Sequence, residues 1–278
     1  MSTPTRTRHR LDGDLGPIDI DVRAGGRDSP RPAVLILHGF KGFKDWGMFP
    51  PFAERLARAG FTAVSFNMSG SGVDAEGAPA FPERFARNTI GADLRDTSAV
   101  ARALSAGALG VVPPSRMGIV GHSRGGGVAL LYAAEDPQVG AVVTWAAIAT
   151  INRWDDETRR RWRERGSLDV VNGRTGQVIP VETALLDEAE QHGTGLDIRS
   201  AASRLAIPWL SIHGTDDESV PFEEGKSLAE SAASPGRVDW MPLAGAGHTF
   251  GAAHPWRPPV PAAEQVFDAT IRFLARVL

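Results

Sequence analysis

One serine lies in a sequence context that is typical of a catalytic nucleophile. Residues 121–125 (GHSRG) fit the pattern G-x-S-x-G, which follows an apolar run at 116–120 and opens a helical pattern over 123–134. A nucleophile on a tight strand-to-helix turn needs small neighbours, which the two glycines supply. The start of the helix also presents N–H groups and a positive partial charge beside the serine. Ser123 is therefore the candidate nucleophile.

A serine hydroxyl is a weak nucleophile at neutral pH and needs a general base. Of the seven histidines, His248 is the strongest candidate, because it lies in a Gly-rich loop (GAGHTF) between the last predicted strand and the last predicted helix. His254 follows in the same loop and is the alternative. His38 and His213 each end an apolar run as His-Gly, where the ring more often shapes a turn, and His122 is expected to be packed.

The base in turn needs a carboxylate that orients its imidazole and stabilises the imidazolium. Residues 213–221 (HGTDDESVP) follow the apolar run 207–212 and contain three acids in a row. We expect Asp217 to take this role, with Asp216 as the alternative. At least one of the three acids is expected to lie in an exposed turn or to cap the helix that begins near residue 222.

The oxyanion that forms during acyl transfer needs two N–H donors. The backbone N–H of Arg124, directly after the nucleophile, is one candidate. The other is the backbone N–H of Phe40, in the sequence HGF that follows the apolar run 33–37.

The elements that must position these residues follow the pattern of a parallel sheet covered by helices, because short apolar runs alternate with longer amphipathic ones. Residues 6–10 and 18–23 instead alternate apolar and polar residues, which predicts an antiparallel pair at the edge of the sheet. The predicted strands lie at 6–10, 18–23, 33–37, 61–66, 116–120, 139–144, 207–212 and 237–241, and the predicted helices at 49–59, 90–104, 123–134, 222–231 and 262–277. With 278 residues and roughly eight strands, residues 1–278 are predicted to form a single α/β domain.

Residues 145–204 interrupt this pattern after the sixth predicted strand. They are rich in Trp and Arg and contain no clear buried strand, so we expect an inserted cap rather than a structureless loop. Ile151, Trp154, Thr158 and Trp162 recur at helical spacing, which predicts an amphipathic helix whose Trp stripe packs on the rest of the domain. The alternative hypothesis is that Trp154 and Trp162 roof an acyl or aromatic pocket while an arginine meets a substrate carboxylate.

The composition excludes several classes of protein. The chain contains no cysteine, so disulfides, thiolate metal sites and a Cys nucleophile are excluded. A formal net charge of −3 gives no reason to expect nucleic acid or an anionic membrane as a partner. No run approaches the ~20 apolar residues of a membrane-spanning helix, and the polar beginning of the sequence lacks a secretory signal, which predicts a cytoplasmic protein. P-loop, complete G-x-G-x-x-G and H-E-x-x-H motifs are missing, so we expect neither a cofactor nor a metal.

In this order along the chain, the HGF, GHSRG, HGTDDESVP and GAGHTF sequences resemble those of the α/β-hydrolase superfamily. Within it, the chain is most similar to bacterial cinnamoyl/feruloyl esterases and dienelactone-hydrolase-like esterases. The resemblance covers essentially the whole chain outside the insertion, and implies hydrolysis of carboxylic esters through an acyl-enzyme intermediate without a cofactor. Two features depart from it. Residues 68–72 (MSGSG) stand where an Arg-Gly-His-Gly sequence is usual, and the insertion does not match a cinnamoyl-esterase cap.

The sequence therefore predicts a serine esterase with a Ser-His-Asp triad that acts on a small-molecule ester. A serine peptidase or amidase and a thioesterase on the same fold are alternatives, as is a non-catalytic binding protein with a hydrolase-like fold. No feature of the sequence specifies an oligomeric state.

Overall fold

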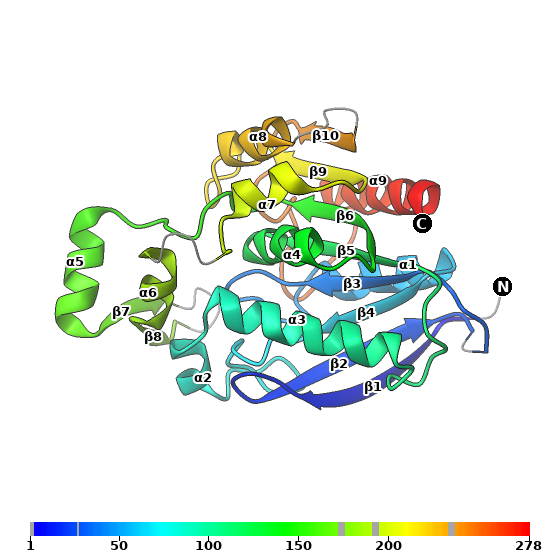
Figure 1. The fold of residues 1–278 in the computed structure, drawn as a ribbon, viewed down its shortest axis with the longest axis horizontal. Coiled ribbons are helices and arrows are strands. Elements are labelled where there is room, and N and C mark those ends of the chain that lie inside the picture. The colour runs from blue at the N-terminus through cyan, green and yellow to red at the C-terminus, as the bar shows by residue number, and fades with distance from the viewer. Residues whose placement is uncertain (1–2, 27, 172–175, 191–194, 233–236) are drawn as a thin grey trace.

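The computed structural model describes residues 3–26, 28–171, 176–190, 195–232 and 237–278. Its main sheet has eight strands (Figure 1). In spatial order they are β1 (Thr5–Asp12), β2 (Pro17–Ala24), β4 (Thr62–Phe66), β3 (Ala33–Leu37), β5 (Met117–His122), β6 (Val139–Trp145), β9 (Trp209–Gly214) and β10 (Val238–Leu243). The β1–β2 and β2–β4 pairs are antiparallel and the other five pairs are parallel. The prediction of a mostly parallel α/β sheet is confirmed.

The central strands are apolar throughout because both of their faces are covered. All five residues of β3 (AVLIL) are buried. Leu35 and Leu37 pack into one hydrophobic core, whereas Val34 and Ile36 pack into a second core on the opposite face. This is the arrangement expected of a parallel strand between two helical layers.

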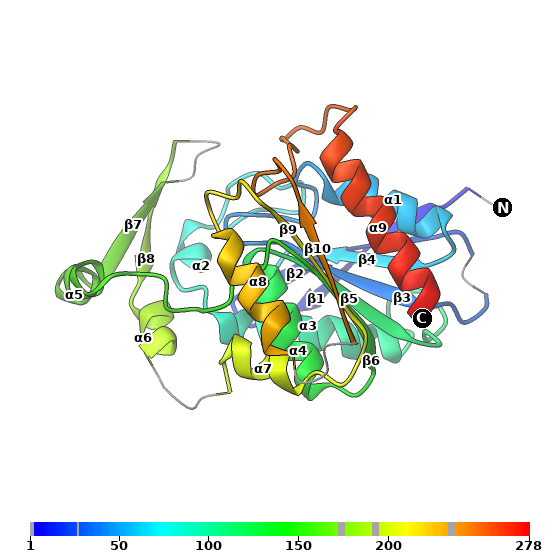
Figure 2. The same ribbon diagram turned by 90° about the horizontal axis from the view of Figure 1, so that it is seen from above.

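Helices cover the two faces separately, as Figure 2 shows. The core on one face contains residues of α1 (Phe49–Arg58) and α9 (Pro261–Val277). The core on the other face contains residues of α3 (Ile90–Ser105), α4 (Arg124–Glu135), α7 (Ile198–Arg204) and α8 (Phe222–Ser231), and also of the short α2 (Pro82–Ala86).

The chain between β6 and β9 forms a projection at the left of Figure 1. It contains α5 (Asp156–Arg165), the antiparallel pair β7 (Ser167–Val171) and β8 (Val178–Glu182), and α6 (Ala184–Glu190). The chain then returns through α7, which packs against α4 and α8 in the helical layer. The sequence predicts no buried strand here because β7 and β8 are half-exposed, and Asp169 interrupts the apolar residues of β7 as Pro180 interrupts those of β8.

The helix of the projection begins later than predicted. The carboxylate of Asp155 accepts a hydrogen bond from the N–H of Thr158 at 2.7 Å, so Asp155 is the N-cap of α5 and the helix begins at Asp156. Ile151 and Trp154 therefore precede the helix, and the prediction that they form one helical stripe with Thr158 and Trp162 is wrong. The two tryptophans still meet, edge to face, with ring centroids 4.8 Å apart.

Polar contacts hold the projection together and join it to the rest of the domain. Trp162 is buried and donates from Nε1 to the carbonyl oxygen of Val181 at 2.8 Å, which joins α5 to β8. On α6, the carboxylate of Glu188 accepts hydrogen bonds from the N–H groups of Ile90 (2.8 Å) and Gly91 (3.0 Å). A carboxylate at this helix N-terminus is favoured by the helix dipole and fixes α6 against α3.

In the described parts of the chain, no helix combines the length and the apolar character that crossing a membrane requires.

Candidate active site

Ser123 occupies the sharp turn between β5 and α4. Its backbone has φ 56° and ψ −121°, a conformation that residues other than glycine rarely adopt. The neighbouring glycines are sterically required, because a Cβ on Gly121 would lie 2.1 Å from the carbonyl oxygen of Gly125, and one on Gly125 would lie 2.4 Å from that of His38. The turn therefore presents the serine at the carboxyl end of the sheet, as the G-x-S-x-G pattern predicts.

Two further loops at this end of the sheet bring a histidine and a carboxylate together. His248, in the loop after β10, has its Nδ1 2.8 Å from Oδ2 of Asp217, in the loop after β9. The other oxygen of Asp217 accepts hydrogen bonds from the N–H groups of Ser219 (2.8 Å) and Val220 (2.9 Å). Asp216, the alternative acid, is exposed and accepts a hydrogen bond from Thr215 Oγ1. The structure thus places Asp217 and not Asp216 against His248.

Asp217 is held in its charged form. Its burial, the largest single influence, raises its pKa, but the hydrogen bonds of His213, His248 and the N–H of Val220 together outweigh burial and hold the pKa well below its usual range. His213 is buried beneath this carboxylate, with its Nε2 3.3 Å from Asp217 Oδ2 and 2.9 Å from the carbonyl oxygen of Val220. A permanently charged carboxylate favours the imidazole tautomer with the proton on Nδ1.

His122 fixes the loop that carries His248. Its Nε2 lies 2.9 Å from the carbonyl oxygen of His248, and the two rings are 4.7 Å apart. Burial, followed by the proximity of His248, lowers the pKa of His122 to about 3. His122 is therefore neutral near pH 7, and because a carbonyl only accepts, Nε2 carries the proton. The sequence predicts a packed residue at this position and gives no signal for this contact, since its partner lies 126 positions away.

Two other histidines make contacts that shape loops. His254 accepts a hydrogen bond at Nδ1 from the N–H of Gly47 at 3.1 Å. His38 has its Nδ1 2.9 Å from the carbonyl oxygen of Gly39 and accepts at Nε2 from the N–H of Met68 at 3.1 Å. Burial lowers the pKa of His38 to about 4, so this ring is also neutral near pH 7.

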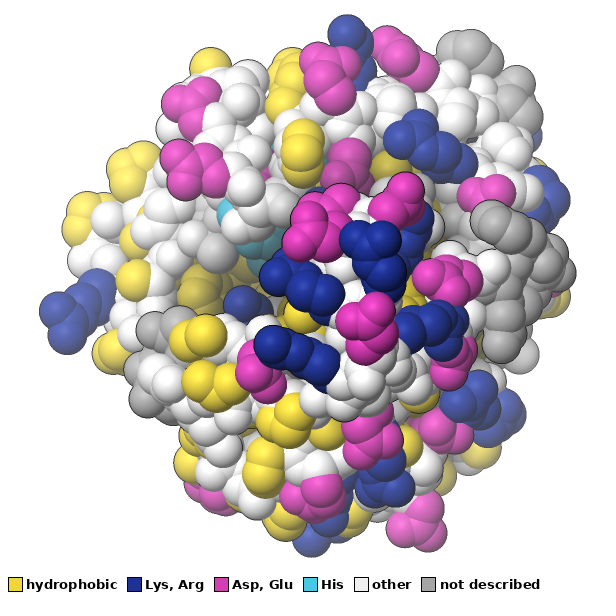
Figure 3. Space-filling view, turned by 90° about the vertical axis from the view of Figure 1, so that its left-hand side faces the viewer, with side chains coloured by type: hydrophobic (Ala, Val, Ile, Leu, Met, Phe, Trp, Pro, Cys, Tyr) yellow, Lys and Arg dark blue, Asp and Glu magenta, His cyan; other side chains and the backbone are white. Residues whose placement is uncertain are grey.

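Ser123 and His248 both border two hollows. The larger, of about 310 Å³, extends towards the projection and is lined by Phe40, Lys41, Ile90, Ser123, Arg124, Ile148, Ile151, Arg153, Trp154, Leu185, Ser219, Val220 and His248. The smaller, of about 210 Å³, is lined by Gly39, Phe40, Lys41, Gly42, Trp46, Phe49, His122, Ser123, His248 and Thr249. Figure 3 shows the molecule from this end, with a hollow beside the charged surface of the projection, a histidine at its edge and hydrophobic and basic side chains around it.

The two candidate oxyanion donors lie beside the serine. Arg124 is the first residue of α4, where the N–H groups have no partner within the helix. The loop that carries Phe40 lies directly against Ser123, because a Cβ on Gly39 would lie 2.9 Å from the Cβ of Ser123. The guanidinium of Arg124 also lies 5.5 Å from the centre of the Phe40 ring, and its Nε donates to Asp93 at 2.7 Å.

The two tryptophans of the projection occupy different places. Trp154 lines the larger hollow, whereas Trp162 is buried behind it and borders neither hollow in the described part of the chain. Within the described residues there is likewise no group of three His, Asp or Glu side chains that could hold a metal ion.

Known proteins agree with this architecture. The α/β hydrolase fold family matches residues 32–169, about half of the chain, including β3, the serine turn and α5. The chain belongs to the α/β-hydrolase superfamily. The resemblance noted in the sequence is thereby confirmed.

A curated relative of this α/β-hydrolase is 2,6-dihydropseudooxynicotine hydrolase from Paenarthrobacter nicotinovorans, 27% identical over 227 residues. The match covers 80% of this chain and 54% of the relative, so the chain spans about half the length of that protein.

Solved structures with this fold cover nearly the whole chain. Est1E from Butyrivibrio proteoclasticus with bound ferulic acid has a TM-score of 0.71 at 17% identity, covering 97% of this chain and 98% of its own. Dienelactone hydrolase from Anabaena variabilis has a TM-score of 0.65 at 17% identity, with 99% of each chain covered. The esterase domain of a Rhodothermus marinus protein has a TM-score of 0.65 at 19% identity, with 98% of each chain covered. At these identities the likeness establishes the fold.

Proposed function

We propose that this α/β-hydrolase cleaves carboxylic esters, with Ser123 as nucleophile, His248 as general base and Asp217 as the orienting acid. The observation that carries the proposal is the 2.8 Å contact between His248 Nδ1 and Asp217 Oδ2, beside a serine in a strained turn that lines the same two hollows. Membership of the superfamily supports hydrolysis as the class of reaction. One structural neighbour, from Rhodothermus marinus, is an esterase domain.

The reaction takes two stages. Ser123 Oγ attacks the ester carbonyl carbon while His248 Nε2 takes its proton, and the charge that develops on the carbonyl oxygen is stabilised by the N–H groups of Phe40 and Arg124. The tetrahedral intermediate collapses, and the alcohol leaves with the proton from His248. A water molecule, deprotonated by His248, then attacks the acyl-enzyme, and the carboxylic acid leaves as Ser123 regains its proton.

The surroundings of the three residues suit these steps. The charged Asp217 stabilises the imidazolium of His248 in both stages, and backbone donors hold that carboxylate in place so that it need not reorient during the reaction. The hydrogen bond from His122 fixes the backbone of the His248 loop. The two hollows offer separate space for the acyl group and for the alcohol on either side of the reacting carbonyl.

A fluorophosphonate probe together with p-nitrophenyl esters tests the proposal. We expect the wild-type protein to be labelled and to release p-nitrophenol, and Ser123→Ala to do neither. Parallel thioester and anilide substrates distinguish an esterase from a thioesterase or amidase, and 2,6-dihydropseudooxynicotine belongs in the same screen because a curated relative is named for it. A wild-type protein that is neither labelled nor active on any of these substrates would instead be a binding protein on a hydrolase fold.

A further inference from the structure

Histidines apart, the charged side chains that line the two hollows beside Ser123 are all cationic. Lys41, Arg124 and Arg153 line the larger hollow, and Lys41 also lines the smaller one, whereas no Asp or Glu is among the described residues that line either. The nearby carboxylates, such as those of Asp93 and Glu224, contact the lining residues but do not themselves line either hollow. Whether the hollow attracts an anion therefore depends on which cations those carboxylates already neutralise.

Both arginines are already paired. The Nε of Arg124 donates to the buried carboxylate of Asp93 at 2.7 Å. Nη1 of Arg153 lies 2.7 Å from both carboxylate oxygens of Glu224, and its Nη2 donates to the carbonyl oxygen of Ser219. Their charges are compensated within the protein, so neither offers a free cation to a ligand. An arginine that meets a substrate carboxylate, as the sequence suggested, is therefore not favoured for Arg153.

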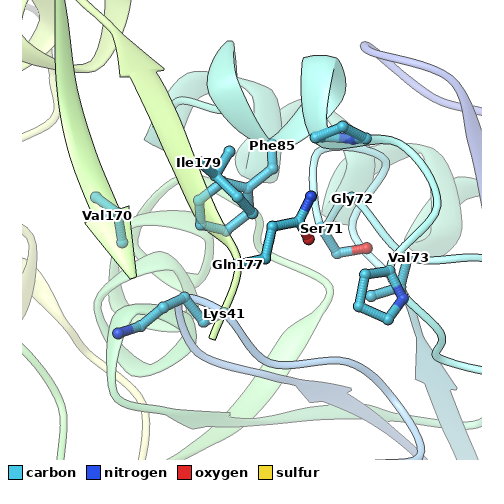
Figure 4. Close-up of a pocket in the computed structure, with 10 residues that line it drawn as sticks. Lys41, Ser71, Gly72, Val73, Phe85, Val170, Gln177 and Ile179 are labelled. Atoms are coloured by element: carbon cyan, nitrogen blue, oxygen red, sulfur yellow. The ribbon is translucent and has the colours of Figure 1, made fainter. Parts of the chain in front are cut away.

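Lys41 differs from both arginines. Its side chain is exposed, and no described carboxylate lies within salt-bridge distance of its ammonium group. The undescribed residues, 1–2, 27, 172–175, 191–194 and 233–236, contain no Asp or Glu that could pair with it. Lys41 also borders a small recess under β7 and β8, where Figure 4 shows its ammonium end directed away from Ser71 and Gln177. Lys41 thus lines both hollows beside the serine and carries a positive charge that no described carboxylate neutralises.

The backbone of Lys41 is strained. The turn 39–42 is closed by a hydrogen bond from the N–H of Gly42 to the carbonyl oxygen of Gly39 at 3.0 Å, and Lys41 is its third residue, with φ 61°. Glycine is the residue that this position favours, and another residue costs about 1 kcal/mol. A lysine here is more easily understood if its side chain has a role. The same turn carries Phe40, so the lysine is anchored one residue from a candidate oxyanion donor.

We propose that Lys41 binds a carboxylate group of the substrate. The substrate would be an ester that carries a second, anionic carboxylate a few bonds from the reacting carbonyl, with an apolar remainder that fits against Ile148, Ile151, Trp154 and Leu185. A lysine bound to a carboxylate forms a charge-assisted hydrogen bond, which is stronger than one between neutral groups. The ester part of this inference rests on the proposed function, but the anion site does not.

The kinetic test compares two substrates that differ in one group. The p-nitrophenyl monoester of glutarate and p-nitrophenyl pentanoate have similar shapes, and only the first carries a terminal carboxylate. We expect the wild-type protein to prefer the glutarate monoester, and Lys41→Met to reduce the ratio of the two kcat/KM values by about tenfold or more. Lys41→Arg should restore most of the preference. Lys226→Met, which removes the same charge from α8, is the matched control and should leave the ratio unchanged.

A second pair of substrates places the carboxylate on the alcohol side. If 4-acetoxybenzoate is preferred over phenyl acetate in a Lys41-dependent way, Lys41 binds the leaving group rather than the acyl group, and the anion site stands. An unchanged ratio in Lys41→Met for both pairs, or an equal change in Lys226→Met, overturns the proposal.

A binding measurement separates this inference from the proposed function. In Ser123→Ala, which cannot form an acyl-enzyme, glutarate should quench tryptophan fluorescence at lower concentrations than pentanoate, because Trp154 and Trp46 line the two hollows. The difference should vanish in Ser123→Ala with Lys41→Met. Ester hydrolysis without any such difference refutes the anion site alone, whereas Lys41-dependent binding of glutarate without hydrolysis of any ester refutes the proposed function alone.

Discussion

Replacing Asp217 with Asn removes the charge beside His248 and keeps the shape of the side chain. In the structure, Oδ1 of Asp217 accepts from the N–H groups of Ser219 and Val220, and Oδ2 faces His248 Nδ1. An Asn carbonyl oxygen can keep both backbone donors, and its NH₂ group then faces Nδ1. Because an amide NH₂ donates, it favours the imidazole tautomer with its proton on Nε2, which then cannot accept the serine proton.

The loss of the tautomer and of the counter-charge sets the size of the effect. We expect kcat/KM for a p-nitrophenyl ester to fall by about 10³–10⁴-fold in Asp217→Asn, with an unchanged circular dichroism spectrum. A 10⁴-fold decrease corresponds to about 5–6 kcal/mol of transition-state stabilisation. The assay is release of p-nitrophenol near neutral pH, with Ser123→Ala as the blank.

Asp216→Asn is the matched control for this change. It makes the same substitution one residue earlier, on an exposed side chain that contacts Thr215 rather than a histidine. Its kcat/KM should stay within about twofold of the wild-type value, as is usual for surface positions. The reasoning is refuted if Asp216→Asn loses the activity, or if Asp217→Asn keeps more than about a tenth of it.

Four further predictions follow from contacts in the same region. His122→Phe removes the hydrogen-bond donor to the loop that carries the proposed base, so kcat should fall about tenfold, which corresponds to the free energy of one such hydrogen bond. An unchanged kcat would mean that the loop keeps its position without this hydrogen bond. Trp154→Ala should alter the ratio of kcat/KM between aromatic and short acyl esters, and equal losses on all esters would contradict its place in the pocket. Trp162→Ala should instead lower the melting temperature, since losing a buried tryptophan costs about 3–5 kcal/mol. Ser123→Gly should be more stable to urea than Ser123→Ala by about 1 kcal/mol, because only glycine adopts φ 56° without strain, and equal midpoints would argue against strain. Burial lowers the pKa of His38 to about 4 and that of His122 to about 3, so both rings are neutral in the folded state and become protonated on unfolding below pH ~6.5. The free energy of unfolding should therefore fall as the pH drops from about 6.5 towards 4, by up to about 1 kcal/mol per pH unit for each histidine. A urea midpoint that stays constant over this range would contradict the prediction.

The parts of the fold that sequence reasoning predicted are those whose signal is local. The continuous apolar run of β3 is read directly as a strand covered on both faces, and the structure buries all five of its residues. The G-x-S-x-G pattern likewise combines a steric requirement with its strand and helix context, all within about twenty residues. Loop order along the chain then indicated which histidine and which acidic segment would reach the same edge of the sheet.

The parts that the sequence did not predict depend on contacts between distant segments or on backbone geometry. The β7–β8 pair is half-exposed, and Asp169 and Pro180 interrupt the apolar residues of its two strands, unlike those of the central strands. The start of α5 is decided by the cap of Asp155, whereas the tryptophan spacing suggested a longer helix. The contact between His122 and the carbonyl oxygen of His248 joins residues 126 positions apart, and no sequence pattern around either residue predicts it.

Backbone strain in this protein is concentrated around the candidate active site. Among the described residues, four other than glycine have positive φ, namely Lys41, Ser123, Ala146 and Phe250. Two of them line the hollows, one directly follows β6 next to the serine turn, and the fourth lies two residues after His248. Such conformations cost about 1–3 kcal/mol each and persist only where the surrounding structure enforces them. Folding stability alone gives no reason to gather that cost at one edge of the sheet. The need to hold the proposed nucleophile, the proposed oxyanion loop and the loop of His248 in one geometry does give such a reason, and it accounts for Lys41 and Ser123 by the same argument.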